Sequence, residues 1–220
     1  MKKKHSFFYR NSLTIVFMSL FLITLYAQAL SGWKEHNQEL KELKASELPL
    51  ADYLASGHFI SATFENFESE FLQMSMYVIM TVFLRQVGSA ESKKFDEKEE
   101  VDREPAPYTD APWPVKKGGV LLKIYSNSLF IVFALLFFCS WGLHFYGSLQ
   151  DHNVSRTLKG LPKDSVISYL GEPQFWFETF QNWQSEFLSV AAIVFLTIYL
   201  RQKGSPESKP VDAPNMETGK

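Results

Sequence analysis

The chain has 220 residues, with 22 Lys and Arg against 24 Asp and Glu and a formal net charge of −2. This near-neutral balance lacks the basic excess that is typical of nucleic-acid-binding proteins, so we expect no nucleic acid among its partners. The length alone would suit one or two soluble domains. The charge is unevenly spread, however, because residues 11–33 and 124–150 contain no Asp, Glu, Lys or Arg.

Both uncharged stretches are long enough to cross a bilayer. A helix rises about 1.5 Å per residue and the hydrocarbon core is about 30 Å thick, so roughly 20 residues suffice. The first stretch follows Lys2, Lys3 and Lys4 and ends near an Ala-Gln-Ala sequence, which also resembles a signal peptide. We expect this helix to be retained, because it corresponds to the internal second stretch in the repeat that follows.

The chain aligns with itself at an offset of 116 residues without a gap. Between residues 9–93 and 125–209, 31 of the 85 positions are identical, whereas chance would give about 5 or 6. The nonapeptide FENFESEFL, which begins at Phe64, recurs as FQNWQSEFL at Phe180, each time before an apolar run. We infer that the chain arose by duplication of one unit.

Each half of the repeat predicts one transmembrane hairpin. A long apolar helix is followed by a polar loop, the aromatic and acidic nonapeptide, and a second apolar run that ends at Arg85 or Arg201. The sequence therefore predicts an all-α membrane protein with four transmembrane helices, arranged as two duplicated hairpins. Of the 22 Lys and Arg, 16 lie in the two terminal segments and the central linker and 6 in the loops within the hairpins. This bias predicts that both termini and the linker are cytoplasmic and that the two repeats run parallel.

The predicted organisation has four parts. The hairpin repeats occupy residues 1–87 and 119–203, joined by a linker at 88–118 and followed by a tail at 204–220. The linker includes FDEKEEVDREPAPYTDAPWPVKKGG, which is charged and rich in proline. Such a segment cannot bury enough apolar surface to offset its ordering entropy, so we expect the linker and the tail to be disordered.

The second half resembles a known family most closely. Its sequences FWFETFQNWQSEFL, at 175–188, and LRQKGSPESKPV, at 200–211, are similar to the signature of an uncharacterised family of bacterial inner-membrane proteins classed as a domain of unknown function. The first half departs from this pattern, because HFISATFENFESEFL lacks tryptophan and carries additional glutamates. The resemblance implies a multi-pass protein of the bacterial inner membrane, and it brings no activity and no functional residues.

The second apolar run of each half is too short to span by itself. Only 14 uncharged residues separate Glu70 from Arg85 and Glu186 from Arg201, which corresponds to about 21 Å of helix. Each helix must therefore recruit the nonapeptide, while the arginines act as cytoplasmic anchors by snorkelling. On a helical wheel, one polar stripe then contains Thr63, Asn66, Glu70, Thr81, Thr179, Asn182, Glu186 and Thr197. An aromatic stripe beside it contains Phe64, Phe67, Phe71, Phe180, Trp183 and Phe187.

The polar stripe has two interpretations. In the first, the aromatics form an interfacial belt, the glutamates lie among headgroups, and Asn and Thr make inter-helix hydrogen bonds of about 0.6 kcal/mol each. In the second, Glu70 and Glu186 face each other inside the bundle and bind a cation or a proton, because an intramembrane carboxylate is costly unless it is used or paired. The direction in which the stripe points would separate the two interpretations.

A histidine–asparagine pair also recurs, as His36-Asn37 and His152-Asn153, just after the first span of each half. Two His with two Glu could ligate a metal. Asparagine in a loop more often bonds to nearby backbone, and we favour that interpretation. We therefore expect no metal and no cofactor, with His36 and His152 as the weak candidates for ligands.

Enzyme signatures are missing from the sequence. There is no phosphate-binding Gly-rich loop, no His-Glu-x-x-His, no paired Cys and no nucleophile elbow, so we expect no catalytic activity. The favoured function is that of a structural or interaction protein of the bacterial inner membrane. Its partners would be the lipid bilayer and either another protein or a second copy of the chain. The alternative is a small transport or cation- or proton-binding protein that uses the glutamate pair.

Overall fold

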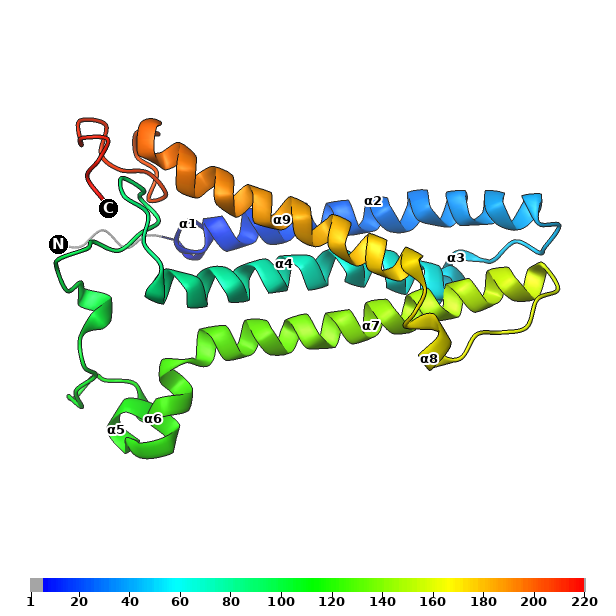
Figure 1. The fold of residues 1–220 in the computed structure, drawn as a ribbon, viewed down its shortest axis with the longest axis horizontal. Coiled ribbons are helices and arrows are strands. Elements are labelled where there is room, and N and C mark those ends of the chain that lie inside the picture. The colour runs from blue at the N-terminus through cyan, green and yellow to red at the C-terminus, as the bar shows by residue number, and fades with distance from the viewer. Residues whose placement is uncertain (1–5, 220) are drawn as a thin grey trace. The chain divides into compact units, whose positions relative to one another are not determined.

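A computed structural model describes residues 6–219, and within that range it contains helices, turns and loops but no strand. The prediction of an all-α chain is therefore confirmed. Figure 1 shows the four long helices, which are α2 (Ser12–Glu42), α4 (Gly57–Phe83), α7 (Ser128–Leu158) and α9 (Pro173–Tyr199). The short elements are α1 (Phe7–Arg10), α3 (Leu50–Tyr53), η1 (Glu100–Asp102), α5 (Trp113–Lys117), α6 (Gly119–Ser126) and α8 (Val166–Tyr169).

The helix boundaries follow the sequence offset. Helices α2, α3 and α4 begin and end 116 residues before α7, α8 and α9 respectively. This is the same offset at which the sequence aligns with itself, so aligned residues occupy equivalent positions along their helices.

Asn and Ser side chains explain where the two longest helices begin. Asn11 and Asn127 each donate a 2.8 Å hydrogen bond to the carbonyl four residues earlier. Ser12 and Ser128 donate to the carbonyl three residues earlier, at 3.1 and 2.8 Å. These bonds satisfy the carbonyls that are left free where α1 and α6 end. The chain can therefore break there and restart as α2 or α7.

The repeated arginines close the other two long helices. Nη1 of Arg85 and Nη1 of Arg201 each donate to two carbonyls in the last turn of α4 or α9 and to the carbonyl of the residue after the helix, at 2.9–3.4 Å. A cation at this end also interacts favourably with the helix dipole. Gly88 and Gly204 have positive φ angles of 80° and 86°, in the turn that follows each helix.

The nonapeptide of each half is helical, as predicted. It lies within α4 and within α9, which contain 27 residues each and are therefore about 40 Å long. Helices α2 and α7 contain 31 residues each, and an 18-residue window of each has a mean hydropathy of 2.0. These two helices are long and apolar enough to cross a membrane.

The chain divides into two compact units that do not coincide with the two repeats. The first unit comprises the chain up to Thr63 together with Leu143–Gly171, and the second comprises Phe64–Gly142 together with Glu172–Lys220. Each unit therefore takes residues from both halves of the sequence, and α4 and α7 contribute residues to both units. The predicted boundaries at 87, 118 and 203 follow the sequence repeat instead.

In the first unit, two glycines allow the start of α4 to approach α7 closely. A Cβ atom placed on Gly147 would lie 2.5 Å from the backbone nitrogen of Ser61 and 2.9 Å from the carbonyl oxygen of Gly57. A Cβ atom on Gly57 would lie 2.5 Å from the carbonyl oxygen of Gly147. Small residues at such a crossing are the usual device for close helix packing in membranes.

In the second unit, the linker and the tail contain short helices and specific hydrogen bonds. The structure gives the linker η1 and α5, and it gives the tail a set of specific hydrogen bonds. Nζ of Lys209 lies within 3.2 Å of four carbonyl oxygens, and the side chain is buried. The acceptors belong to Gly88, Pro214, Asn215 and Glu217. The backbone of the tail is therefore built around one lysine side chain.

The tail also contacts the turn that follows α4. The backbone nitrogen of Gly88 donates to Oγ1 of Thr218 at 2.9 Å, and the backbone nitrogen of Gly219 donates to the carbonyl of Ser89 at 3.0 Å. A Cβ atom on Gly88 would lie 2.5 Å from the carbonyl oxygen of Asn215, whereas one on Gly204 would meet no atom within 4 Å. Equivalent glycines of the two halves thus have different surroundings.

Candidate functional site

Two asparagine clamps close the loops that follow α2 and α7, and both lie in the first unit. Asn37 exchanges two hydrogen bonds with the backbone of Leu48, at 2.9 and 2.7 Å. Asn153 exchanges the equivalent two with the backbone of Asp164, at 3.1 and 2.7 Å. A side-chain amide here replaces a backbone partner and satisfies one donor and one acceptor of the loop. This confirms the prediction that these asparagines bond locally.

Beside each clamp, a histidine lies against a buried tyrosine. The ring centroids are 5.8 Å apart for His36 and Tyr53 and 4.9 Å apart for His152 and Tyr169. Both tyrosines are buried, and they come from the equivalent short helices α3 and α8. We call the two sets the first His–Tyr frame (His36, Asn37, Tyr53) and the second His–Tyr frame (His152, Asn153, Tyr169).

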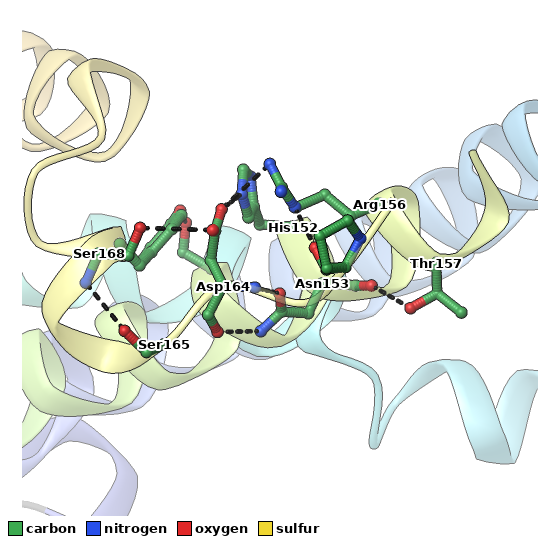
Figure 2. A network of polar contacts seen from close by, with 10 residues as sticks. His152, Asn153, Arg156, Thr157, Asp164, Ser165 and Ser168 are labelled. Atoms are coloured by element: carbon green, nitrogen blue, oxygen red, sulfur yellow. Dashed lines mark hydrogen bonds and ion pairs between the residues drawn. The ribbon is translucent and has the colours of Figure 1, made fainter. Parts of the chain in front are cut away.

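An ion-paired carboxylate completes the second His–Tyr frame, as Figure 2 shows. Oδ2 of Asp164 lies 2.8 Å from Nε2 of His152 and 3.2 Å from Nη1 of Arg156. The bond to His152 and the charge of Arg156 hold the pKa of Asp164 below its usual range. Ser168 also donates to this carboxylate, at 3.3 Å. The second frame is therefore a closed network of internal partners.

This network predicts an acid-sensitive loop. Because the folded-state pKa of Asp164 is lowered, its stabilising contribution is present above the pKa of the unfolded chain and is lost as the pH falls through the folded-state pKa. We expect Asp164→Asn to melt at a lower temperature than the wild type at pH 7, and the two curves to converge below about pH 4. Thermal unfolding of detergent-solubilised protein from pH 3 to pH 7 measures this difference.

A second carboxylate serves as the control for that measurement. Asp110 is exposed, so Asp110→Asn should keep the wild-type melting temperature across the same range. A constant difference between wild type and Asp164→Asn at every pH would contradict the proposed ionic contribution.

The first His–Tyr frame lacks the carboxylate and the arginine. Leu48 occupies the position equivalent to Asp164, and Leu40 the position equivalent to Arg156. His36 lies instead beside His58, near the start of α4, with ring centroids 4.6 Å apart. Burial lowers the pKa of His36, and the neighbouring His58 lowers it further.

Acidic and phenolic groups surround the two histidines. Oε2 of Glu39 lies 3.7 Å from Nδ1 of His36, and Oε2 of Glu35 lies 3.6 Å from Nε2 of His58. Oη of Tyr53 and Nδ1 of His58 are hydrogen-bonded at 3.2 Å. Burial raises the pKa of Tyr53 to about 12, with smaller contributions from Glu35 and Asp151. This phenol therefore stays protonated at neutral pH, while the histidines and carboxylates could serve as ligands.

An open pocket of about 350 Å³ reaches this cluster from one side. It is lined by Gln28, Ser31, Gly32, Glu35, Tyr53, His58 and Ala62, all of the first unit. A Cβ atom at Gly32 would overlap Oη of Tyr53. Glycine at this position therefore makes room for the phenol, whereas its equivalent in the other half, Ser148, hydrogen-bonds to Tyr169.

The polar stripe that the sequence predicted is not uniformly oriented. Its threonines Thr63, Thr179 and Thr197 are buried, whereas Asn66 and Glu70 are exposed. Its remaining members, Thr81, Asn182 and Glu186, are half-buried. The eight residues therefore differ in burial along the two helices.

Several members of the stripe have identifiable partners within the second unit. Oγ1 of Thr197 lies 3.2 Å from Oγ of Ser89. Nδ2 of Asn182 donates to Oε1 of Glu65 at 3.3 Å, and Nε2 of Gln73 donates to the carbonyl of Glu186 at 2.8 Å. These contacts join α4, its following turn and α9, so they fit the structural interpretation of the stripe.

The six residues of the aromatic stripe also differ in their burial. Phe180 and Phe187 are exposed, while Phe64, Phe67, Phe71 and Trp183 are half-buried. Phe71 lies 6.4 Å from Phe133 between ring centroids, and Trp183 lies 5.9 Å from Phe137. Both partners belong to α7. The two copies of the nonapeptide thus each bring an aromatic side chain against the first part of α7.

Sequence reasoning missed three residues of note. Glu68 is fully buried, although the helical wheel considered only Glu70 and Glu186 for an inward position. Glu39 and His58 join His36, but neither has an identical counterpart in the second half. The sequence did carry a signal for Glu39. It follows His36 by three residues, so the two side chains lie on one face of the helix.

Comparison with known proteins gives one match. A family model described as a domain of unknown function (DUF6766) matches residues 4–220. No curated protein and no solved structure matches the chain.

Proposed function

Because the chain belongs to the DUF6766 family, which is described only as a domain of unknown function, we propose a function from its own residues. The protein crosses the inner membrane of a bacterium four times, as two duplicated hairpins with cytoplasmic termini and a cytoplasmic linker. It acts there as a structural or interaction protein, without catalytic activity. Its partners are lipid and either another membrane protein or a second copy of itself.

The exposed apolar surface of α2 and α7 carries this proposal. Only 6% of the most apolar window of α2 and 17% of that of α7 is buried. Phe17 on α2 is 63% exposed, and Leu135 on α7 is 59% exposed. A core helix of a soluble protein would be mostly buried, and continuous exposed apolar surface of this extent is typical of contact with lipid.

The equivalence of the two halves supports the count of four spans. The helix boundaries share one offset, and the asparagine clamps, the arginine caps and the Asn-Ser helix starts recur at aligned positions. If α2 and α7 span in the same direction, α4 must return the chain between them, and α9, as the equivalent of α4, would return it after α7. The excess of Lys and Arg in the termini and the linker supports a cytoplasmic location for those segments.

The alternative function, transport through a glutamate pair, has weaker support. Glu70 is exposed and Glu186 is half-buried, and the amide of Gln73 contacts the backbone of Glu186. We therefore base no transport function on this pair.

Reporter fusions test the topology. We expect cytoplasmic reporter activity from fusions after Asp110 in the linker and at the C-terminus, because both segments are rich in basic residues. Fusions after Lys44 and Lys159, in the two hairpin loops, should report the opposite side and so serve as matched controls. A periplasmic signal from the linker or from the C-terminus would overturn the four-span topology.

A further inference from the structure

We propose that His36, Glu39 and His58 form a binding site for one divalent transition-metal ion of the zinc class. This site goes beyond the structural role proposed above and does not depend on it. The three residues lie in the first unit, two on α2 and one near the start of α4.

The geometry of the three side chains fits one ion. Each residue offers one ligand atom, and the three atoms all lie within 4.8 Å of one another. Ligands at zinc distances of about 2.1 Å are about 3.4 Å apart in a tetrahedral site, so small side-chain rotations would bring these atoms into place. Two imidazoles and one carboxylate form an established donor set for zinc and for other first-row metals.

An unpaired buried nitrogen is the second, independent observation. His36 is only 7% exposed, and its Nδ1 has no hydrogen-bond partner among the described residues. A buried polar atom in this state costs free energy unless a ligand satisfies it. Oε2 of Glu39, at 3.7 Å from this nitrogen, is too distant for a hydrogen bond. A metal ion between the two atoms would satisfy both.

The neighbouring residues prepare His58 for the same role. The hydrogen bond between Tyr53 and Nδ1 of His58 fixes the ring and leaves Nε2 as the nitrogen for a metal. Metal-bound histidines commonly use their second nitrogen in this way. Glu35 and the open pocket beside His58 supply a route of entry and a further oxygen.

In the second His–Tyr frame, the equivalent histidine has an ion-paired partner within the chain. There, Asp164 pairs with His152, and Arg156 pairs with the same carboxylate of Asp164. In the first frame both positions carry leucine, and Glu39 and His58 replace residues that are Ser155 and Gln174 in the other half. The two halves thus share the His, Asn and Tyr of the frame. They differ at the four surrounding positions, which determine whether the histidine has an ion-paired partner within the chain or neighbours that could bind a metal with it.

Cobalt binding to the full-length protein tests the proposal. Co²⁺ accepts the ligands of zinc sites and, unlike Zn²⁺, absorbs visible light when it is bound with low coordination number. We expect detergent-solubilised protein, treated with chelator and dialysed, to bind one Co²⁺ per chain with visible absorption bands, and Zn²⁺ to displace the Co²⁺. Titration of the bands gives the dissociation constant.

Variants separate this site from adventitious binding. We expect His58→Ala to weaken Co²⁺ binding by more than about 100-fold, Glu39→Gln by at least about tenfold, and Tyr53→Phe by about tenfold through loss of the supporting hydrogen bond. His152→Gln changes the equivalent histidine of the other half and should leave the affinity unchanged. His58 is partly exposed and Glu39 is on the surface, so these two changes should preserve the fold, which circular dichroism checks.

Two outcomes would overturn the proposal. The first is the absence of stoichiometric Co²⁺ binding by folded wild-type protein. The second is binding that survives in both His58→Ala and Glu39→Gln, or that His152→Gln weakens as much as they do. Either result can occur with the four-span topology intact, so this test and the reporter fusions fail independently.

Discussion

Replacing Gly147 with alanine is expected to destabilise the protein by about 1–3 kcal/mol, and replacing it with leucine by more. The new Cβ atom would lie 2.5 Å from the backbone nitrogen of Ser61 and 2.9 Å from the carbonyl oxygen of Gly57. Backbone atoms of a helix cannot move aside as a flexible side chain can, so α4 and α7 would have to separate there. For a chain of this length, each kcal/mol lowers the melting temperature by about 2–4 °C.

The same helix offers a matched control for this substitution. Gly142 precedes Gly147 by five residues on α7, and a Cβ atom there would meet no atom within 4 Å. Gly142→Ala should therefore leave the melting temperature unchanged or raise it, because alanine is the better helix former by about 1 kcal/mol. Equal melting temperatures for Gly147→Ala and Gly142→Ala in detergent would mean that the helices do not approach closely at Gly147.

Replacing Lys209 with methionine is expected to release the tail. Methionine matches the length of the lysine side chain but donates no hydrogen bond, so the four carbonyls around Nζ would lose their shared donor. Each buried carbonyl left unsatisfied costs about 1–3 kcal/mol, and every 1.4 kcal/mol is a factor of ten in an equilibrium. We expect backbone amides in residues 210–219 to exchange with deuterium more than about tenfold faster.

Lys93 is the equivalent lysine of the first half and provides the control. Its Nζ pairs with Asp102 at 2.5 Å, and the Asp102 side chain is 33% exposed. Such pairs near the surface contribute about 0–1 kcal/mol, so Lys93→Met should change exchange in the tail by less than about fivefold. If Lys209→Met and Lys93→Met gave the same exchange in residues 210–219, the carbonyl cage around Lys209 would be disproved.

The sequence predicted the helices well because their signals are local and repeated. Apolar runs long enough for a bilayer gave α2 and α7, and the self-alignment indicated that the nonapeptide continues into α4 and α9. The Asn-Ser pairs and the arginines recur at the helix ends, where side chains can satisfy the free carbonyls. Such features depend on neighbours three or four residues away, so spacing alone reveals them.

The candidate site was harder to predict because it depends on packing. A helical wheel identifies residues that share a face but not the face that is buried, so it left the direction of Glu70 open and did not reveal that Glu68 is the buried glutamate. The self-alignment drew attention to His36, which is duplicated, and away from His58, which is not. The approach of α4 to α7, which the glycines at Gly57 and Gly147 permit, cannot be seen without coordinates.

The asparagine clamps also bear on the order of events during synthesis. Each clamp joins residues only 11 positions apart, Asn37 to Leu48 and Asn153 to Asp164. A loop of about ten residues closes in about 10–100 ns, whereas a ribosome adds only about 5–20 residues per second. Each clamp can therefore form before the next long helix has emerged, so that the turn after α2 or α7 is already set when α4 or α9 forms.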